Sequence, residues 1–214
     1  MQLDHPITFI KGYIQNPRAV GSFFPASEAL AAAMCEPYRR AKLRHATVLE
    51  VGAGTGPITR QIGSVLGASD DLDVCELNNA FADILEQHVL ANEAFTPAVA
   101  QGRVRLLRIP AQKLNPERQY DFVICGLPFT AFDLSDVAEI LAVIRRCMKP
   151  GAVFTYYEYA WVRRLSRACA VRDRKRFREV SDYMSEVIRR YQFQRDTVWM
   201  NLPPAHVRHL RFDS

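Results

Sequence analysis

A glycine-rich turn between a strand pattern and a helix pattern constrains the fold of this chain most. Residues 46–51 form a short apolar run, Gly52-Ala-Gly-Thr-Gly56 follows it, and a helical pattern begins at Ile58. Glycines this closely spaced let the backbone turn sharply and let a ligand approach the main chain. The context predicts a nucleotide-like cofactor, although the spacing differs from both the dinucleotide fingerprint and the phosphate-binding P-loop.

Strand and helix signals alternate along most of the remaining chain. Asp133 is a good N-cap for one of the helices, and Lys149-Pro-Gly151 is expected to end it. Repeated βα units imply a mostly parallel sheet covered by helices on both faces, with ligands at the carboxyl ends of its strands. The predicted strands are residues 46–51, 72–76, 104–109, 121–125 and 152–157, and the predicted helices are 27–34, 58–66, 81–89 and 134–144.

Length and composition fit one ordinary globular domain. The chain has 214 residues, of which 49% are hydrophobic and 24% charged, so a second catalytic domain does not fit. We expect an N-terminal helical membrane or lid segment over residues 1–45 and one structural unit over 46–214. Because we find neither a run of ~18 apolar residues nor the features of a signal peptide, we expect a cytoplasmic protein.

The five cysteines are scattered and form no C-x-x-C pair. This pattern argues against a disulfide framework and against a zinc site, so we expect reduced core cysteines and no metal. The cysteines are Cys35, Cys75, Cys125, Cys147 and Cys169.

The form Glu50-x-Gly-x-Gly-x-Gly56 resembles motif I of class I S-adenosylmethionine-dependent methyltransferases. The resemblance implies a Rossmann-like α/β fold with a mostly parallel seven-stranded sheet. It implies S-adenosylmethionine as cofactor, S-adenosylhomocysteine as product, and Glu76 as the acceptor for both ribose hydroxyls. Ala111 or Gln112 is expected to contact adenine, because the usual acidic residue after the third strand is missing. The expected cofactor-binding residues are Glu50, Gly52, Gly54, Thr55, Gly56, Glu76, Leu77, Ala111 and Gln112.

The loop Gly126-Leu-Pro-Phe129 follows the fourth strand, where such enzymes face the transferable methyl group. Relatives that methylate exocyclic amino groups have a side-chain amide at the first position, and Gly126 leaves only backbone carbonyls for that role. This difference weakens an interpretation as a ribosomal RNA adenine dimethyltransferase, which also needs a C-terminal helical domain. The expected catalytic residues are Gly126, Leu127, Phe129 and Tyr156.

Four motifs in order resemble bacterial phospholipid N-methyltransferases over nearly the whole length. They are an N-terminal group from Phe9 to Ser27, the core 54–59, the loop 126–128 and the ending 198–205. The resemblance implies methylation of the amine of phosphatidylethanolamine, up to three times toward phosphatidylcholine, or of ornithine lipid. It places Tyr156 at the position of a site tyrosine. The alternatives are an rRNA adenine N6-dimethyltransferase-like enzyme and a non-catalytic membrane- or RNA-binding module.

Two features suit a membrane surface. The first predicted helix is amphipathic, although it can equally pack on the protein as a lid, and residues 163–178 carry eight basic side chains, which can also be a solvated helix face. We expect a lipid head group and an anionic membrane surface as partners, no nucleic acid, and peripheral association with the inner membrane. The residues expected at substrate or membrane are Ile10, Tyr13, Ser22, Phe23, Arg172, Arg174, Lys175 and Asn201.

Methyl transfer requires a neutral amine, whereas an alkylamine has a pKa of about 10.4. Tyr156, Glu158 and His5 are candidate proton acceptors, and partial desolvation beside a positive sulfonium also lowers the amine pKa without a dedicated base. The aromatic residues at the end of the fifth strand can attract a methylated cation or simply fill the core.

Overall fold

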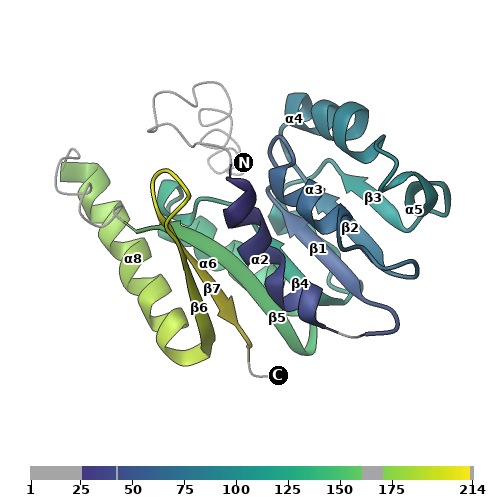
Figure 1. Cartoon of the computed structure of the whole chain (residues 1–214). Coiled ribbons are helices and arrows are strands. Elements are labelled where there is room, and N and C mark those ends of the chain that lie inside the picture. Colours follow the sequence, from purple (N-terminus) through teal and green to yellow (C-terminus); the bar gives the residue numbers. More distant parts are fainter. Residues whose placement is uncertain (1–25, 42, 161–170, 213–214) are drawn as a thin grey trace, which may run out of the picture.

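Seven strands form one sheet in the order β3-β2-β1-β4-β5-β7-β6, in a computed structural model that describes residues 26–41, 43–160 and 171–212, with the backbone alone for 171–174 (Figure 1). Strands β1 to β5 run parallel, and β7 runs antiparallel to both β5 and β6. The expected mostly parallel, Rossmann-like sheet is confirmed. The strands are β1 (Thr47–Val51), β2 (Asp71–Cys75), β3 (Val104–Leu107), β4 (Tyr120–Cys125), β5 (Met148–Tyr159), β6 (Gln192–Val198) and β7 (Ala205–Leu210).

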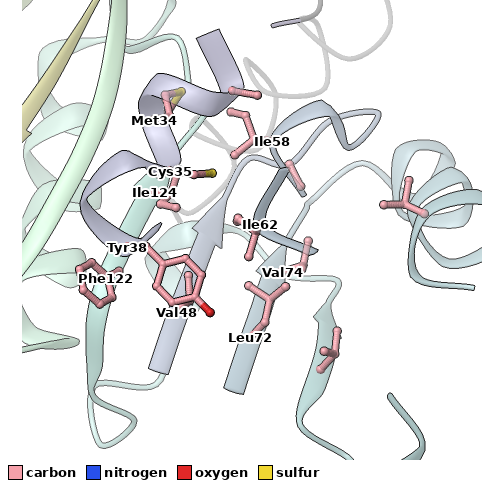
Figure 2. Packing of buried hydrophobic residues seen from close by; sticks show 14 of the residues in the cluster. Met34, Cys35, Tyr38, Val48, Ile58, Ile62, Leu72, Val74, Phe122 and Ile124 are labelled. Atoms are coloured by element: carbon pink, nitrogen blue, oxygen red, sulfur yellow. The ribbon is translucent and has the colours of Figure 1, made fainter. Parts of the chain in front are cut away.

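Helices cover both faces of the sheet, as the βα alternation predicts. Val48 packs with Leu30 and Ile62 on one face, whereas its neighbour Leu49 packs with Ile140 on the other (Figure 2 shows the first of these cores). Successive side chains of a strand point to opposite faces, so a central parallel strand must be apolar on both. The helices are α2 (Glu28–Arg40), α3 (Pro57–Gly63), α4 (Asn79–Ile84), α5 (Thr96–Ala100), α6 (Leu134–Arg146) and α8 (Val171–Tyr191), with a π-helical turn η1 (Leu85–Leu90) and 3-10 turns η2 (Ala111–Lys113) and η3 (Phe129–Ala131).

Helix α2 belongs to the core of the domain. Its N-cap Ser27 accepts a hydrogen bond from the Leu30 amide at 3.2 Å. The Tyr38 ring lies 5.4 Å from that of Phe122, and its hydroxyl donates to Asp70 at 2.6 Å. The helix therefore runs beyond the predicted end at residue 34, and the predicted boundary at residue 45 separates α2 from the core on which it packs. Residues 1–25, the rest of the expected N-terminal segment, lie outside the described residues.

Other predicted boundaries shift for local reasons. Asp133 occupies the N-cap position of α6, yet its side chain makes no capping hydrogen bond there. Helix α6 ends at Arg146, before the predicted stop at Lys149. Lys149 lies instead inside β5, where its ammonium group pairs with Asp121 at 2.7 Å. The predicted helix 81–89 becomes α4 followed by η1, which turns Leu85 toward the glycine-rich loop.

The cysteines in the described ranges are buried free thiols, and Cys169 lies outside those ranges. Burial raises the pKa of both Cys75 and Cys125 to about 12, so these thiols keep their protons at neutral pH. Within the described ranges, no helix combines the length and apolar character needed to cross a membrane. No group of three or more metal-ligating side chains is found among the same residues.

Candidate functional site

A cavity of about 240 Å³ lies at the carboxyl ends of β1, β2 and β4, where the sequence predicts a ligand. The glycine-rich loop forms one wall, the residues after β2 a second, and the loop after β4 a third. The predicted site residues that line it are Gly52, Gly54, Thr55, Glu76, Leu77, Ala111, Gln112, Gly126 and Leu127.

The three glycines of the turn have different roles, although all have positive φ. Gly54 lines the cavity, and a Cβ there would meet nothing within 4 Å. A Cβ on Gly52 would lie 2.5 Å from a methyl of Leu127, so this glycine allows the two loops to pack together. Gly56 does not line the cavity; a Cβ there would lie 2.8 Å from the side chains of both Leu85 and Val89. Gly54 therefore leaves its backbone open to a ligand in the cavity, whereas Gly56 allows the loop to pack against Leu85 and Val89.

Glu76 joins the cavity wall to the glycine-rich loop. One carboxylate oxygen accepts from the Gly54 amide and the other from the Asn78 amide, both at 2.8 Å. Burial raises the pKa of Glu76, and these amides partly oppose the rise. A carboxylate has about four acceptor positions, so the two amides leave capacity for two hydroxyls of a ligand.

Glu50 does not line the cavity. It is fully buried on the other side of β1, where no described residue hydrogen-bonds to either carboxyl oxygen. Burial raises the pKa of Glu50 to about 8; the nearby Thr59 lowers it and the charge of Glu76 raises it further. The structure thus places Glu50 beneath the loop, apart from the other predicted cofactor residues.

Packing explains why the loop after β4 lacks a side chain at its first position. A Cβ on Gly126 would lie 2.6 Å from the backbone oxygen of Gly52, and the Gly126 amide already donates to Val51 at 2.8 Å. Any side chain here would push the two loops apart, since the opposing atom is backbone. Only main-chain carbonyls can orient a substrate at this point.

A second cavity, of about 170 Å³, lies between α8 and the end of β5. It shares Pro128 and Tyr157 with the first cavity, so the two are neighbours. The predicted catalytic residues Phe129 and Tyr156 line this second cavity, with their ring centroids 5.6 Å apart. The structure therefore divides the predicted catalytic set, with Gly126 and Leu127 at one cavity and the two aromatic residues at the other.

A partly buried ion pair forms part of the second cavity. Arg208 is 9% exposed, donates from Nε to Glu158 at 2.8 Å, and donates from Nη1 to Gln192 at 2.7 Å. The register of β5 and β7 pairs Tyr156 with Arg208, which brings the ring and the guanidinium to neighbouring positions. The cavity thus combines aromatic walls with a fixed pair of opposite charges.

Two of the predicted substrate and membrane residues have described side chains, Asn201 and Lys175, and neither lines a cavity. The side chain of Asn201 accepts from the Ser27 amide at 3.0 Å and donates to the Pro203 carbonyl at 2.8 Å, which ties the start of α2 to the β6–β7 loop. Lys175 is exposed on α8, 3.8 Å from Glu179. The side chains of Ile10, Tyr13, Ser22, Phe23, Arg172 and Arg174 lie outside the described part of the chain.

Sequence reasoning did not assign several apolar residues of the first cavity. Tyr157 is the most informative, because it borders both cavities while its neighbour Tyr156 faces only the second. Strand alternation separates two adjacent tyrosines in this way, but the sequence does not say which faces which cavity. The other unassigned wall residues include Phe81, Ile109, Phe132 and Ile140.

Comparison with known proteins agrees with this geometry. The family model described as a methyltransferase domain matches residues 48–151. An ornithine lipid N-methyltransferase of Singulisphaera acidiphila is 29% identical over 157 residues, which cover 72% of this chain and 78% of that protein.

Solved structures show the same fold at low sequence identity. A protein provisionally assigned as an rRNA methylase of Clostridium thermocellum superposes with a TM-score of 0.61 and 14% identity, covering 89% of this chain and 99% of its own. DhpI, solved in the DhpI-SAM-HEP complex, superposes with a TM-score of 0.54 and 15% identity. The superposition covers all of this chain and 85% of the DhpI chain. The open backbone at Gly54, the Glu76 carboxylate and the apolar walls fit S-adenosylmethionine as the cofactor. The chain therefore has the Rossmann-like methyltransferase fold, and its residues 48–151 match the model of a methyltransferase domain.

Proposed function

We propose that this enzyme methylates the primary amine of a membrane lipid head group, in the series from phosphatidylethanolamine to phosphatidylcholine or on ornithine lipid. The observation that carries the proposal is the loop after β4, whose Pro128 borders both the cofactor cavity and the aromatic second cavity. The similarity to an ornithine lipid N-methyltransferase over 72% of the chain supports the same substrate class.

The second cavity has the chemistry that an amine head group needs. Its walls include Tyr156, Tyr157, Tyr159 and Phe177, and the faces of such rings attract cations. This attraction persists as methyl groups replace hydrogens, because a quaternary ammonium keeps its charge while losing its hydrogen-bond donors. The pair of Glu158 and Arg208 offers one charge of each sign to a zwitterionic head group.

The residues of this chain position the amine and control its protonation. S-adenosylmethionine supplies the methyl group, carried on a positively charged sulfur. The backbone carbonyls of the 126–128 loop accept from the amine N–H groups and direct its lone pair toward the first cavity. Glu158 is already paired with Arg208, so it does not serve as the base. Desolvation among the aromatic rings supplies the neutral amine, and the Tyr156 hydroxyl orients it.

A lipid substrate places the enzyme at a membrane surface. We propose a cytoplasmic protein that associates peripherally with the inner membrane through electrostatic attraction of its basic residues. Lys175 and Arg178 on α8 are exposed and contribute to this attraction, which is worth about 1 kcal/mol per basic residue near an anionic leaflet.

Radiolabelled methyl transfer tests the proposal. The protein is incubated with labelled S-adenosylmethionine and, separately, vesicles of phosphatidylethanolamine, vesicles containing ornithine lipid, and ribosomal RNA. We expect label in the chloroform phase with a lipid amine. Label in RNA alone would replace the proposal with the adenine methyltransferase alternative. Cofactor binding without transfer to any acceptor would favour a non-catalytic binding module.

A further inference from the structure

The tip of the β6–β7 loop carries the most exposed large apolar side chains among the described residues. Trp199, Met200 and Leu202 are 73%, 85% and 74% exposed. No charged residue occurs between Val198 and Ala205. An apolar tip of this kind costs free energy in water, so it indicates a surface that another phase or molecule covers.

The loop is held firmly at its base. Asn201, between the exposed residues, is 2% exposed and bridges the Ser27 amide and the Pro203 carbonyl. The Pro204 carbonyl accepts from the Ala160 amide at 2.8 Å. The apolar side chains therefore project from an anchored backbone.

The β6–β7 loop lies at the carboxyl end of β5, where Tyr159 pairs with Ala205 (Figure 1). Ala26, next to the Ser27 that Asn201 holds, lines the cofactor cavity, and Ala160 lines the second cavity together with Phe177 of α8. The exposed Lys175 and Arg178 lie in the same part of α8 as Phe177. Apolar tip, basic residues and cavities thus share one end of the sheet.

We propose that the side chains of Trp199, Met200 and Leu202 insert into the interfacial layer of an anionic bilayer and hold the cavities at the membrane surface. This inference rests on the lipid-amine function proposed above. Tryptophan prefers the membrane interface, where its ring is buried and its N–H stays hydrated, and Met200 and Leu202 gain from burial of their apolar area. A second copy of the chain would bring its own basic α8 to this face, so charge favours an anionic lipid surface over self-association.

Tryptophan fluorescence on vesicles tests insertion directly. Trp161 and Trp199 are the two tryptophans, so Trp161→Phe leaves Trp199 as the single reporter. We expect a blue shift of its emission on vesicles of phosphatidylethanolamine and phosphatidylglycerol, and quenching when the acyl chains are brominated. Trp199→Ala should lower the vesicle partition coefficient about tenfold. The triple variant, in which Trp199, Met200 and Leu202 are all replaced by alanine, should lower it about a hundredfold.

Leu43→Ala is the matched control, because Leu43 is 51% exposed and lies between α2 and β1, at the opposite end of the sheet. It should leave the partition coefficient unchanged. Bound vesicles without quenching of Trp199 would overturn the inference. So would a concentration-dependent dimer in gel filtration that the triple variant abolishes.

A soluble substrate separates this inference from the proposed function. With short-chain phosphatidylethanolamine as monomers, the triple variant should keep the wild-type turnover while losing activity on vesicles. Equal loss on both substrates would overturn the anchoring role. If the wild type methylates no lipid amine, the proposed function fails, and quenching of Trp199 still decides whether the loop inserts.

Discussion

Replacing the buried Glu50 by glutamine should change the pH dependence of stability. The carboxyl is fully buried, and no described residue hydrogen-bonds to either of its oxygens. Burial raises its pKa from 4.5 to about 8 in the folded protein. Glutamine has nearly the same shape and cannot ionise.

The sign follows from proton binding. Between pH 4.5 and 8 the unfolded chain has released this proton while the folded chain retains it, so stability falls as pH rises through this range. Each pH unit costs about 1.4 kcal/mol, which gives about 3 kcal/mol at pH 7. In Glu50→Gln this loss disappears. The free energy of unfolding of the variant relative to wild type should therefore rise by about 3 kcal/mol from pH 4.5 to 7 and level off above pH 8.

Urea unfolding followed by circular dichroism at pH 5, 6, 7 and 8 measures this difference. Cofactor is left out, because a ligand that binds only the folded state adds its own stability. The burial of the glutamine amide contributes equally at every pH, so only the change with pH is diagnostic. Glu117→Gln, at an exposed carboxyl, is the control. A stability difference for Glu50→Gln that stays constant from pH 5 to 8 would refute the reasoning.

Four further substitutions test the site. Gly54→Ala should weaken S-adenosylmethionine binding in calorimetry at least tenfold, whereas Gly102→Ala, with a similar positive φ and equally open space, should cost only stability; equal cofactor affinity in both would contradict the assignment of the loop. Gly126→Ala should lower both thermal stability and cofactor affinity, because the new Cβ would lie 2.6 Å from a backbone oxygen, and a wild-type melting curve would count against that packing. Asn201→Ala should destabilise the fold by about 1–3 kcal/mol in urea unfolding, since it removes the side-chain amide that bridges two backbone groups. Tyr156→Phe should lower kcat more than cofactor affinity in the methyl-transfer assay, and an unchanged kcat would remove its hydroxyl from the mechanism.

The sequence by itself determined the order of the five parallel strands, the position of the glycine-rich turn and the acid after the second strand, whereas β6, β7 and α8 were not predicted by residue range. These features are local: a short apolar run predicts each strand, and a ligand loop follows a strand end in a parallel sheet. Gly54 could therefore be placed at a ligand cavity before any coordinates, and the resemblance to class I methyltransferases added Glu76.

Only the tertiary structure decided how the residues are divided between sites. Glu50 and Gly56 belong to the same motif as Gly54 but face the core, because side-chain direction depends on which helix packs on which face of β1. The two adjacent tyrosines of β5 border different sets of cavities, which strand pairing and the position of α8 decide. Contacts between segments far apart in the sequence, such as Asn201 with the start of α2, leave no periodic signal, so they emerge only when the chain is folded.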